Sequence, residues 1–187
     1  MTTILCVGNF GSGNEGQKKV AQLLEYLHNL YECRFIIGLG NSIMSEGVAS
    51  SIDPQFSEKF EEPYKNILGK MKFYNLPGYM DYYTRKSLNS EIKYSGINKN
   101  WVLPHNFYCF KKMINRVPVE FIMIDSNFSK LRNKNMQEKW AINTLLESRS
   151  RWNIVVSHHP WYSNNKNYEC SEELDNLFNK MNNTGKI

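Results

Sequence analysis

The sequence lacks any long run of apolar residues. A helix that crosses a membrane needs about 20 consecutive, predominantly apolar residues, and the 187-residue chain contains no such stretch. Its start passes directly from Met1 into the apolar segment 4–7, without the basic residues and small-residue cleavage site of a secretory leader. These absences predict a cytoplasmic protein with no membrane span.

Charge of one sign is not concentrated anywhere in the chain. Its 23 lysines and arginines exceed the 18 acidic residues, for a formal net charge of +5, but they are spread along the sequence. A nucleic-acid-binding surface needs a basic cluster, so no nucleic-acid partner is predicted. Paired cysteines are also lacking, which removes support for a zinc site. The four cysteines, none of them in a Cys-x-x-Cys motif, are Cys6, Cys33, Cys109 and Cys170.

What the sequence does contain is the composition of one globular domain. Hydrophobic residues make up 41% and charged residues 22% of the chain, which is typical of a soluble protein. A chain of this length can bury a sizeable core. Neither an internal repeat nor a low-complexity linker marks a boundary, so residues 1–187 are predicted to form a single domain.

Strand and helix signals alternate in the first part of the chain. The predicted order is a strand over 2–8, a glycine-rich turn over 8–16, a helix, and a second strand over 34–39. The helix is predicted from apolar residues at helical spacing, which are Val20, Leu23, Leu24, Leu27 and Leu30. Such a β-α-β unit predicts a parallel sheet in an α/β fold.

Further elements are predicted along the rest of the chain. They are a helical region over 56–70 with a break at Pro63, strands over 72–76, 119–124 and 153–156, and an amphipathic helix over 137–148. The apolar side of that helix is predicted to carry Trp140, Leu145 and Leu146. The polar tail from Asn179 onward is predicted to fray.

The glycine-rich turn has two possible interpretations. Residues 11–16 form a Gly-x-Gly-x-x-Gly pattern between a strand and a helix, which is the arrangement of a dinucleotide-binding turn. That reading requires an acidic residue at the end of the second strand, where the sequence has Gly40-Asn41-Ser42. Gly11 also lies four residues beyond Val7, which is late for a phosphate turn. The dinucleotide reading is therefore the weaker one.

The second interpretation of the glycine-rich turn places it among four loops that follow predicted strands. In chain order they are Gly8-Asn9-Phe10-Gly11, Gly40-Asn41-Ser42, Gly78-Tyr79-Met80-Asp81 and Ser157-His158-His159-Pro160. These loops resemble the Gly-Asp-x-Gly, Gly-Asp-Asn, Gly-Asn-His-Asp and Gly-His-His-Pro signatures of metallophosphoesterases. The intervening segments resemble the small purple acid phosphatases in particular, at 41–48, 53–56, 101–108, 121–125 and 152–163. The resemblance implies an αββα sandwich that is shortened at its C-terminus.

The resemblance also implies that the metal site has been lost. The chemistry of that family needs two adjacent metal ions that hold phosphate and activate water. Asn9 and Asn41 stand where the family has aspartate ligands, and each substitution replaces an anionic ligand by a neutral amide. Met44 stands in place of the tyrosinate ligand of the coloured iron site.

The remaining site positions are altered in the same way. Tyr79 replaces a ligand asparagine, and Met80 replaces the histidine that protonates the leaving group. Asp81 is retained, although its family role is to orient that missing histidine. His158 is a retained ligand and His159 follows it, but the later Gly-His-x-His segment is not found. We therefore expect no metal and no catalytic residue, with these eight positions as vestiges of the site.

Several interpretations remain open for these residues. Asn9 and Asn41 are also ordinary residues for loops, His158 and His159 suit a structural role, and Tyr79 and Met80 could fill space that the metals vacated. If the vestiges share one site, Asn9, Asn41, Tyr79 and His158 should converge within about 10 Å at one edge of the sheet.

The resemblance leads to a pseudophosphatase as the first hypothesis for function. Such a protein is catalytically impaired or inactive and serves as a binding or scaffold module, with a protein as its partner. The alternative is a weakly active, metal-dependent phosphomonoester hydrolase (an acid phosphatase) that holds a single, weakly bound iron, zinc or manganese ion through His158. A third alternative is a gene product without a selected activity.

Overall fold

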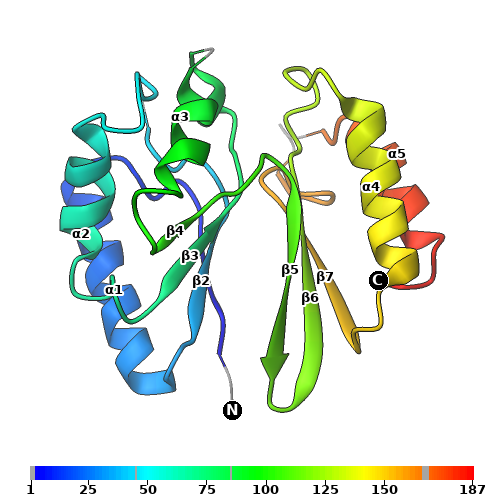
Figure 1. The fold of residues 1–187 in the computed structure, drawn as a ribbon, viewed down its shortest axis with the longest axis horizontal. Helices are drawn as coiled ribbons and strands as arrows, with labels where there is room; N and C mark the ends of the chain where they lie inside the picture. Colours follow the sequence, from blue (N-terminus) through cyan, green and yellow to red (C-terminus); the bar gives the residue numbers. More distant parts are fainter. Residues whose placement is uncertain (1–2, 45, 85, 166–168) are drawn as a thin grey trace. The chain divides into compact units, whose positions relative to one another are not determined.

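A computed structural model describes residues 3–44, 46–84, 86–165 and 169–187 (Figure 1). Residue 2 of the first predicted strand and Ser45 of the 41–48 segment lie outside the described residues. The chain forms two compact units, the first ending at Asn106 and the second spanning Phe107–Ile187. No helix among the described residues is both long and apolar enough to cross a membrane.

The sheet of the first unit has four parallel strands in the order β1-β2-β3-β4. These strands are β1 (Leu5–Val7), β2 (Phe35–Gly38), β3 (Lys72–Asn75) and β4 (Trp101–Val102). Ile36 of β2 is in register with Leu5 on one side and with Phe73 on the other. The predicted β-α-β unit and its parallel sheet are confirmed.

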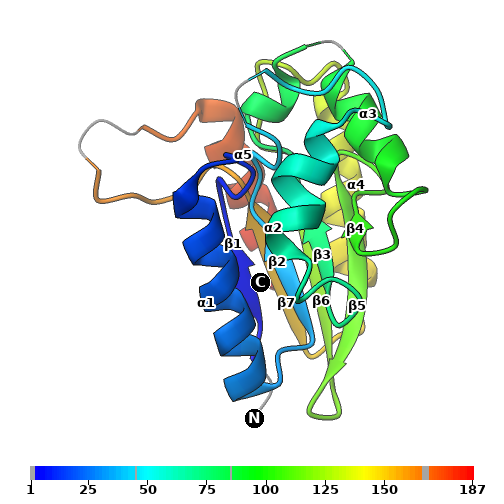
Figure 2. The ribbon, with the colours of Figure 1, turned by 90° about the vertical axis from the view of Figure 1, so that its left-hand side faces the viewer.

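Helical segments cover one face of this sheet. The segments are α1 (Glu15–Tyr31), the π-helical η1 (Ser57–Glu61), α2 (Glu62–Tyr64), the 3₁₀ turn η2 (Met80–Tyr82) and α3 (Ser87–Tyr94). Figure 2 shows α1 and α2 in front of the strands. The Asn14 side chain caps α1 by accepting a hydrogen bond from the Gln17 N–H at 3.0 Å.

One sequence prediction for these helices needs correction, and the apolar residues of α1 are buried only in part. Of the five apolar residues that predicted α1, only Leu24 is buried, whereas Leu23 and Leu30 are each 53% exposed. The predicted helix over 56–70 ends at Tyr64 and gives way to turns. Pro63 lies in α2, directly after the π-helical η1, so the chain is helical up to Pro63 and ends its helix one residue later.

The second unit has a three-stranded sheet in the order β5-β6-β7. Its strands are β5 (Tyr108–Ile114), β6 (Val117–Ile124) and β7 (Trp152–Ser157), and its helices are α4 (Lys134–Glu147) and α5 (Glu172–Asn182). β5 and β6 are antiparallel, whereas β6 and β7 are parallel. The turn between β5 and β6 contains Asn115 and Arg116, both with left-handed φ.

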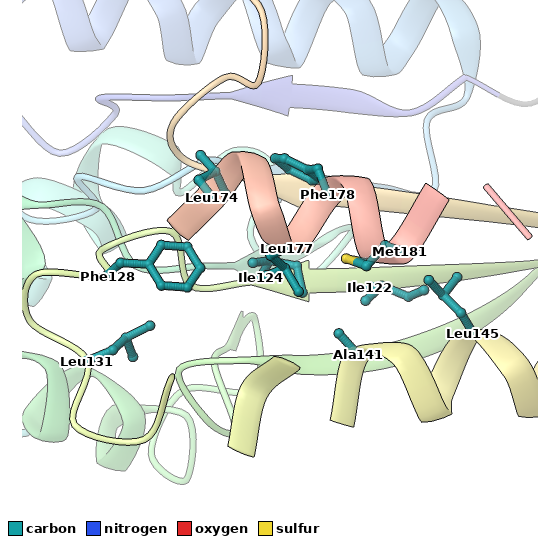
Figure 3. Close-up of a cluster of buried hydrophobic side chains, with 10 residues drawn as sticks. All are labelled: Ile122, Ile124, Phe128, Leu131, Ala141, Leu145, Leu174, Leu177, Phe178 and Met181. Atoms are coloured by element: carbon teal, nitrogen blue, oxygen red, sulfur yellow. The ribbon is translucent and has the colours of Figure 1, made fainter. Parts of the chain in front are cut away.

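α4 and α5 bury one hydrophobic cluster against β6 (Figure 3). Ile122 and Ile124 lie at its centre, and Met181 of α5 is fully buried within it. The prediction of a frayed tail from Asn179 is therefore wrong as far as Asn182, because α5 continues through this region and packs. Leu146 was predicted on the apolar side of its helix, but it is 56% exposed because the buried face runs through Leu145.

Each unit thus supplies one sheet and one layer of helices. The first sheet is entirely parallel, and the second is mixed. This arrangement confirms the predicted α/β class, with helix-covered sheets as in metallophosphoesterases. β4, β5, α3 and α5 were not predicted from the sequence.

Candidate functional site

Asn9 and Asn41 occupy equivalent positions just beyond the ends of β1 and β2. Both have left-handed backbone conformations, with φ of 53° and 52°. Asparagine adopts this conformation more readily than most residues. The Asn9 N–H donates to the Gly40 carbonyl at 3.0 Å, which joins the two turns through their backbones.

The two asparagine side chains are bonded directly to each other. Asn41 Nδ2 donates to Asn9 Oδ1 at 2.7 Å. The backbone N–H of Met80 donates to Asn41 Oδ1 at 2.9 Å. Because an N–H must face an oxygen, the Met80 bond fixes which end of the Asn41 amide points toward Asn9. Three of the predicted loops therefore meet at one cluster in the first unit.

The Tyr79 side chain is about half exposed, at 54%. Tyr79 is the N-cap residue of the η2 turn. The interpretation that Tyr79 fills space vacated by metals stays a prediction. Met80 contributes its backbone N–H to the cluster.

Asp81 is buried and holds two loops together. Its Oδ1 accepts from the Ser42 N–H at 2.8 Å, and its Oδ2 accepts from the Gly78 N–H at 2.7 Å. Burial raises the pKa of Asp81 to about 6, although these backbone bonds favour its charged form and oppose the shift. With Met80 in place of the histidine, this carboxylate orients loop backbone.

Glu91 is a site residue that sequence reasoning missed. It lies on α3, is fully buried, and has Ser87 Oγ at 3.4 Å from its Oε1. Burial raises the pKa of Glu91 well above its ordinary value, and the nearby Asp81 charge raises it further. No motif signalled this residue, because a single glutamate in an unassigned helix has no distinguishing spacing.

Met44 lies near Asn9 at a cavity of about 360 Å³. The cavity is lined mainly by apolar groups, including Phe10, Val20 and Tyr64. The Met44 N–H donates to the Gly11 carbonyl at 2.8 Å. Met44 thus lies close to Asn9, as the corresponding family positions imply.

The glycine-rich turn allows two loops of the first unit to pack closely against each other. A Cβ added at Gly11 would lie 1.7 Å from the Ser42 carbonyl oxygen, so only glycine lets the two turns approach. The Gly13 N–H is already bonded to Gln17 Oε1 at 2.6 Å. These contacts account for the turn without a dinucleotide.

His158 and His159 follow β7 in the second unit. Ser126 Oγ lies 2.8 Å from His159 Nδ1 and also accepts from the His159 backbone N–H at 3.0 Å. Burial lowers the pKa of His159, and the neighbouring His158 lowers it further, whereas Asp125 opposes the shift. The lowered pKa favours the neutral imidazole, and Ser126 holds it in place; the structural role of His159 stays a prediction.

Asp125, which directly follows β6, is also bonded to neighbouring protein groups. It is fully buried, and its Oδ1 accepts from the Asn127 N–H at 3.0 Å. Its own N–H donates to Gln137 Oε1 at 2.9 Å. The convergence of His158 with the loops of the first unit stays a prediction.

The residues of the first unit do not fit a dinuclear metal centre. Asn9 Oδ1 and Asn41 Oδ1 are neutral amide oxygens that each already accept an N–H bond, so they offer a cation weaker ligands than two carboxylates would. Within the described parts of the chain, no three His, Cys, Asp or Glu side chains are grouped to hold a metal. The remaining donors are neutral amides, which are weak ligands for iron, zinc or manganese.

Known proteins resemble this chain over most of its length. The calcineurin-like phosphoesterase family profile matches residues 2–184. Human tartrate-resistant acid phosphatase type 5 is 28% identical over 148 residues, covering 69% of this chain and 45% of that protein. Purple acid phosphatase 17 of Arabidopsis thaliana is 21% identical over 196 residues, covering 92% and 56%, respectively. The chain therefore spans about half the length of these curated relatives.

A solved structure shares the fold. GAP50, described as the anchor in the inner membrane complex of Plasmodium, matches with a TM-score of 0.78 and 20% identity. The match covers 97% of this chain and 62% of that chain. Because the family profile extends over nearly the whole chain and the curated relatives are acid phosphatases, the chain belongs to the calcineurin-like phosphoesterase family, in its purple acid phosphatase-like branch.

Proposed function

We propose that this protein is a pseudophosphatase that acts as a binding or scaffold module. The observation that carries the proposal is the 2.7 Å hydrogen bond from Asn41 Nδ2 to Asn9 Oδ1. Two carboxylates at this separation would repel each other unless a cation lay between them. The amide pair attracts instead, so the two loops hold together without metal.

The neighbouring residues support the same conclusion. A thioether at Met80 can neither donate nor accept a catalytic proton. The Asp81 carboxylate is buried and bonded to the backbone of Ser42 and Gly78. The reaction of the family would therefore lack its metal ligands and its proton donor in the first unit.

A scaffold role has support from the shared fold. GAP50, which shares this fold, is described as the anchor in the inner membrane complex. We extend only the general role to this chain, with a protein as its partner.

Metal analysis and a phosphatase assay on the purified protein test this proposal. We expect substoichiometric iron, zinc and manganese, no colour, and no metal-dependent hydrolysis of p-nitrophenyl phosphate. The absence of colour follows from Met44, which cannot form a tyrosinate–iron charge-transfer complex.

Two outcomes would contradict the proposal. A tightly bound dinuclear centre would show that the native residues bind metal well. Metal-dependent hydrolysis that is lost in His158→Ala but kept in the neighbouring Tyr162→Phe control would support the weakly active, single-metal alternative. Tyr162 is 80% exposed and makes a suitable control for changes in this loop.

A further inference from the structure

Two carboxyl groups from different elements are buried together in the first unit. Asp81 comes from η2 and Glu91 from α3, and neither side chain has measurable exposure. The Asp81 group acts on Glu91 through its charge and through side-chain contact. Among the described residues no N–H or O–H group donates to Glu91 Oε2, so an ionised Oε2 would be buried without a donor.

This carboxyl pair lies between the segment that follows β2 and the helix α3. Asp81 accepts from the Ser42 N–H at 2.8 Å. The Ser87 hydroxyl, one turn before Glu91, accepts from the Val48 N–H at 3.0 Å and contacts Glu91 Oε1. The segment after β2 is therefore attached to the pair at two points, beside Asn41.

No cation offsets this buried charge among the described groups that act on Glu91. η2 contributes the Asp81 carboxylate, α3 contributes the Ser87 hydroxyl, and β4 contributes the Trp101 indole, which donates to the Glu91 backbone carbonyl at 3.1 Å. A further carboxylate near α3 is Glu61 of η1, which accepts hydrogen bonds from the Tyr94 hydroxyl and the Asn98 amide. Two ionised carboxylates in this environment would repel strongly.

We propose that a proton on Glu91 acts as a latch: its presence keeps α3 joined to the Asp81 turn, and its loss releases the segment at Ser42 and Val48. The latch makes access to the Asn41 cluster dependent on pH. It requires neither a metal nor catalysis, so it holds independently of the proposed function.

The direction of the pH effect follows from the chemistry of the two acids. Burial raises the pKa of Asp81 to about 6, and burial and the Asp81 charge raise the pKa of Glu91 well above normal. Asp81 ionises first, because its charge is stabilised by backbone N–H groups, and Glu91 keeps the proton. The stabilisation from a raised acid pKa is complete below the unfolded-state value and is lost as the pH rises through the folded-state value.

Hydrogen exchange measured by mass spectrometry tests the latch in the intact protein. Protection factors, which correct for the intrinsic pH dependence of exchange, should be followed at Ser42 and Val48 from about pH 5 up to the highest pH at which the amides of β6 stay protected. We expect these amides to lose at least about tenfold protection as the pH rises. The amides of β6 in the second unit serve as an internal reference.

Matched variants separate the latch from general effects of pH. Glu91→Gln keeps an N–H donor toward Asp81 but cannot ionise, so its protection at Ser42 and Val48 should not fall with pH. Glu62→Gln alters an exposed acid paired with Lys65 and should follow the parent. A Glu91→Gln profile like that of the parent, or a parent profile without a pH effect, would overturn the proposal.

A second measurement needs no substitution. Carboxyl carbon NMR of the parent protein should show one glutamate that titrates far above the others. If all glutamate carboxyls titrate near their ordinary value, the proposal is wrong, even where Glu91→Gln fails to fold.

Discussion

The Asn41 side chain joins three loops through two hydrogen bonds. Its amide nitrogen donates to Asn9, and its amide oxygen accepts from the Met80 backbone. An aspartate at this position could still accept from Met80 but could not donate to Asn9 while ionised. The left-handed backbone conformation at Asn41 also suits asparagine.

Replacing Asn41 by aspartate should therefore destabilise the protein. The variant Asn41→Asp would place a carboxylate oxygen 2.7 Å from Asn9 Oδ1, with no proton between them at neutral pH. We expect a loss of about 1–3 kcal/mol in the free energy of unfolding, measured by urea denaturation at neutral pH.

Asn115→Asp provides the control for this substitution. Asn115 shares the left-handed backbone conformation, with φ of 50°, but lies exposed in the turn after β5. Its substitution should change stability by less than about 0.5 kcal/mol. Equal losses at both positions would show that backbone conformation, and not the Asn9 bond, explains the effect.

At the scale of elements, α1 shows how far an apolar pattern predicts packing. The spacing from Val20 to Leu30 predicted a helix, and the structure confirms it. The pattern did not reveal which part of the apolar stripe faces the sheet, since that depends on how α1 is rotated about its axis. Leu24 is 4% exposed, whereas the adjacent Leu23 is 53% exposed.

Truncating these two leucines should show how much each contributes to the free energy of unfolding. Leu24→Ala leaves a cavity in the core and should lower the free energy of unfolding by about 2–5 kcal/mol. Leu23→Ala removes the same atoms from a largely exposed side chain and should cost less than about 1 kcal/mol. Urea denaturation of both variants makes the comparison, and a larger loss for Leu23→Ala would contradict this orientation of α1.

The elements that were not predicted have local sequence patterns that are weaker than the family motifs. β5 alternates exposed and less exposed residues, and two consecutive left-handed residues, Asn115 and Arg116, make the turn to β6. α5 is capped by Ser171, whose side chain accepts from the Leu174 N–H, and has acidic residues in its first turn. β4 is too short, at two residues, for any alternation to be visible.

At the scale of the whole molecule, the sequence predicted which loops form the candidate site, but it did not predict the hydrogen bonds between them. The motif order placed Asn9, Asn41, Met44 and Met80 on loops that the structure brings together in the first unit. Which amide end faces which partner depends on backbone positions after folding. The same is true of Glu91, because only the packing of α3 buries it beside Asp81.

Restoring the family residues should make the stability of the folded protein depend on metal. The variant has four substitutions: Asn9→Asp, Asn41→Asp, Tyr79→Asn and Met80→His. Its carboxylates would repel without a cation and be stabilised when one binds. Melting curves should therefore show a lower Tm than the parent without metal and a rise in Tm with zinc or manganese.

The parent protein is the control in that experiment, and its Tm should change little with metal. Hydrolysis should remain poor in the variant because Met80→His restores the proton donor, but the histidines of the later Gly-His-x-His segment are not restored. A parent stabilised by metal as strongly as the variant would mean that the native amides and His158 form a competent site.

The tryptophans, whose fluorescence reports on their surroundings, are divided unequally between the two units. Trp101 is the single tryptophan of the first unit, where it is 1% exposed and stands next to Glu91. The other three, Trp140, Trp152 and Trp161, belong to the second unit. Since Trp152 is 63% exposed, its emission is already that of an indole in water. A shift of the blue, buried component therefore reports largely on the surroundings of Trp101 and of the partly buried indoles packed beside α5.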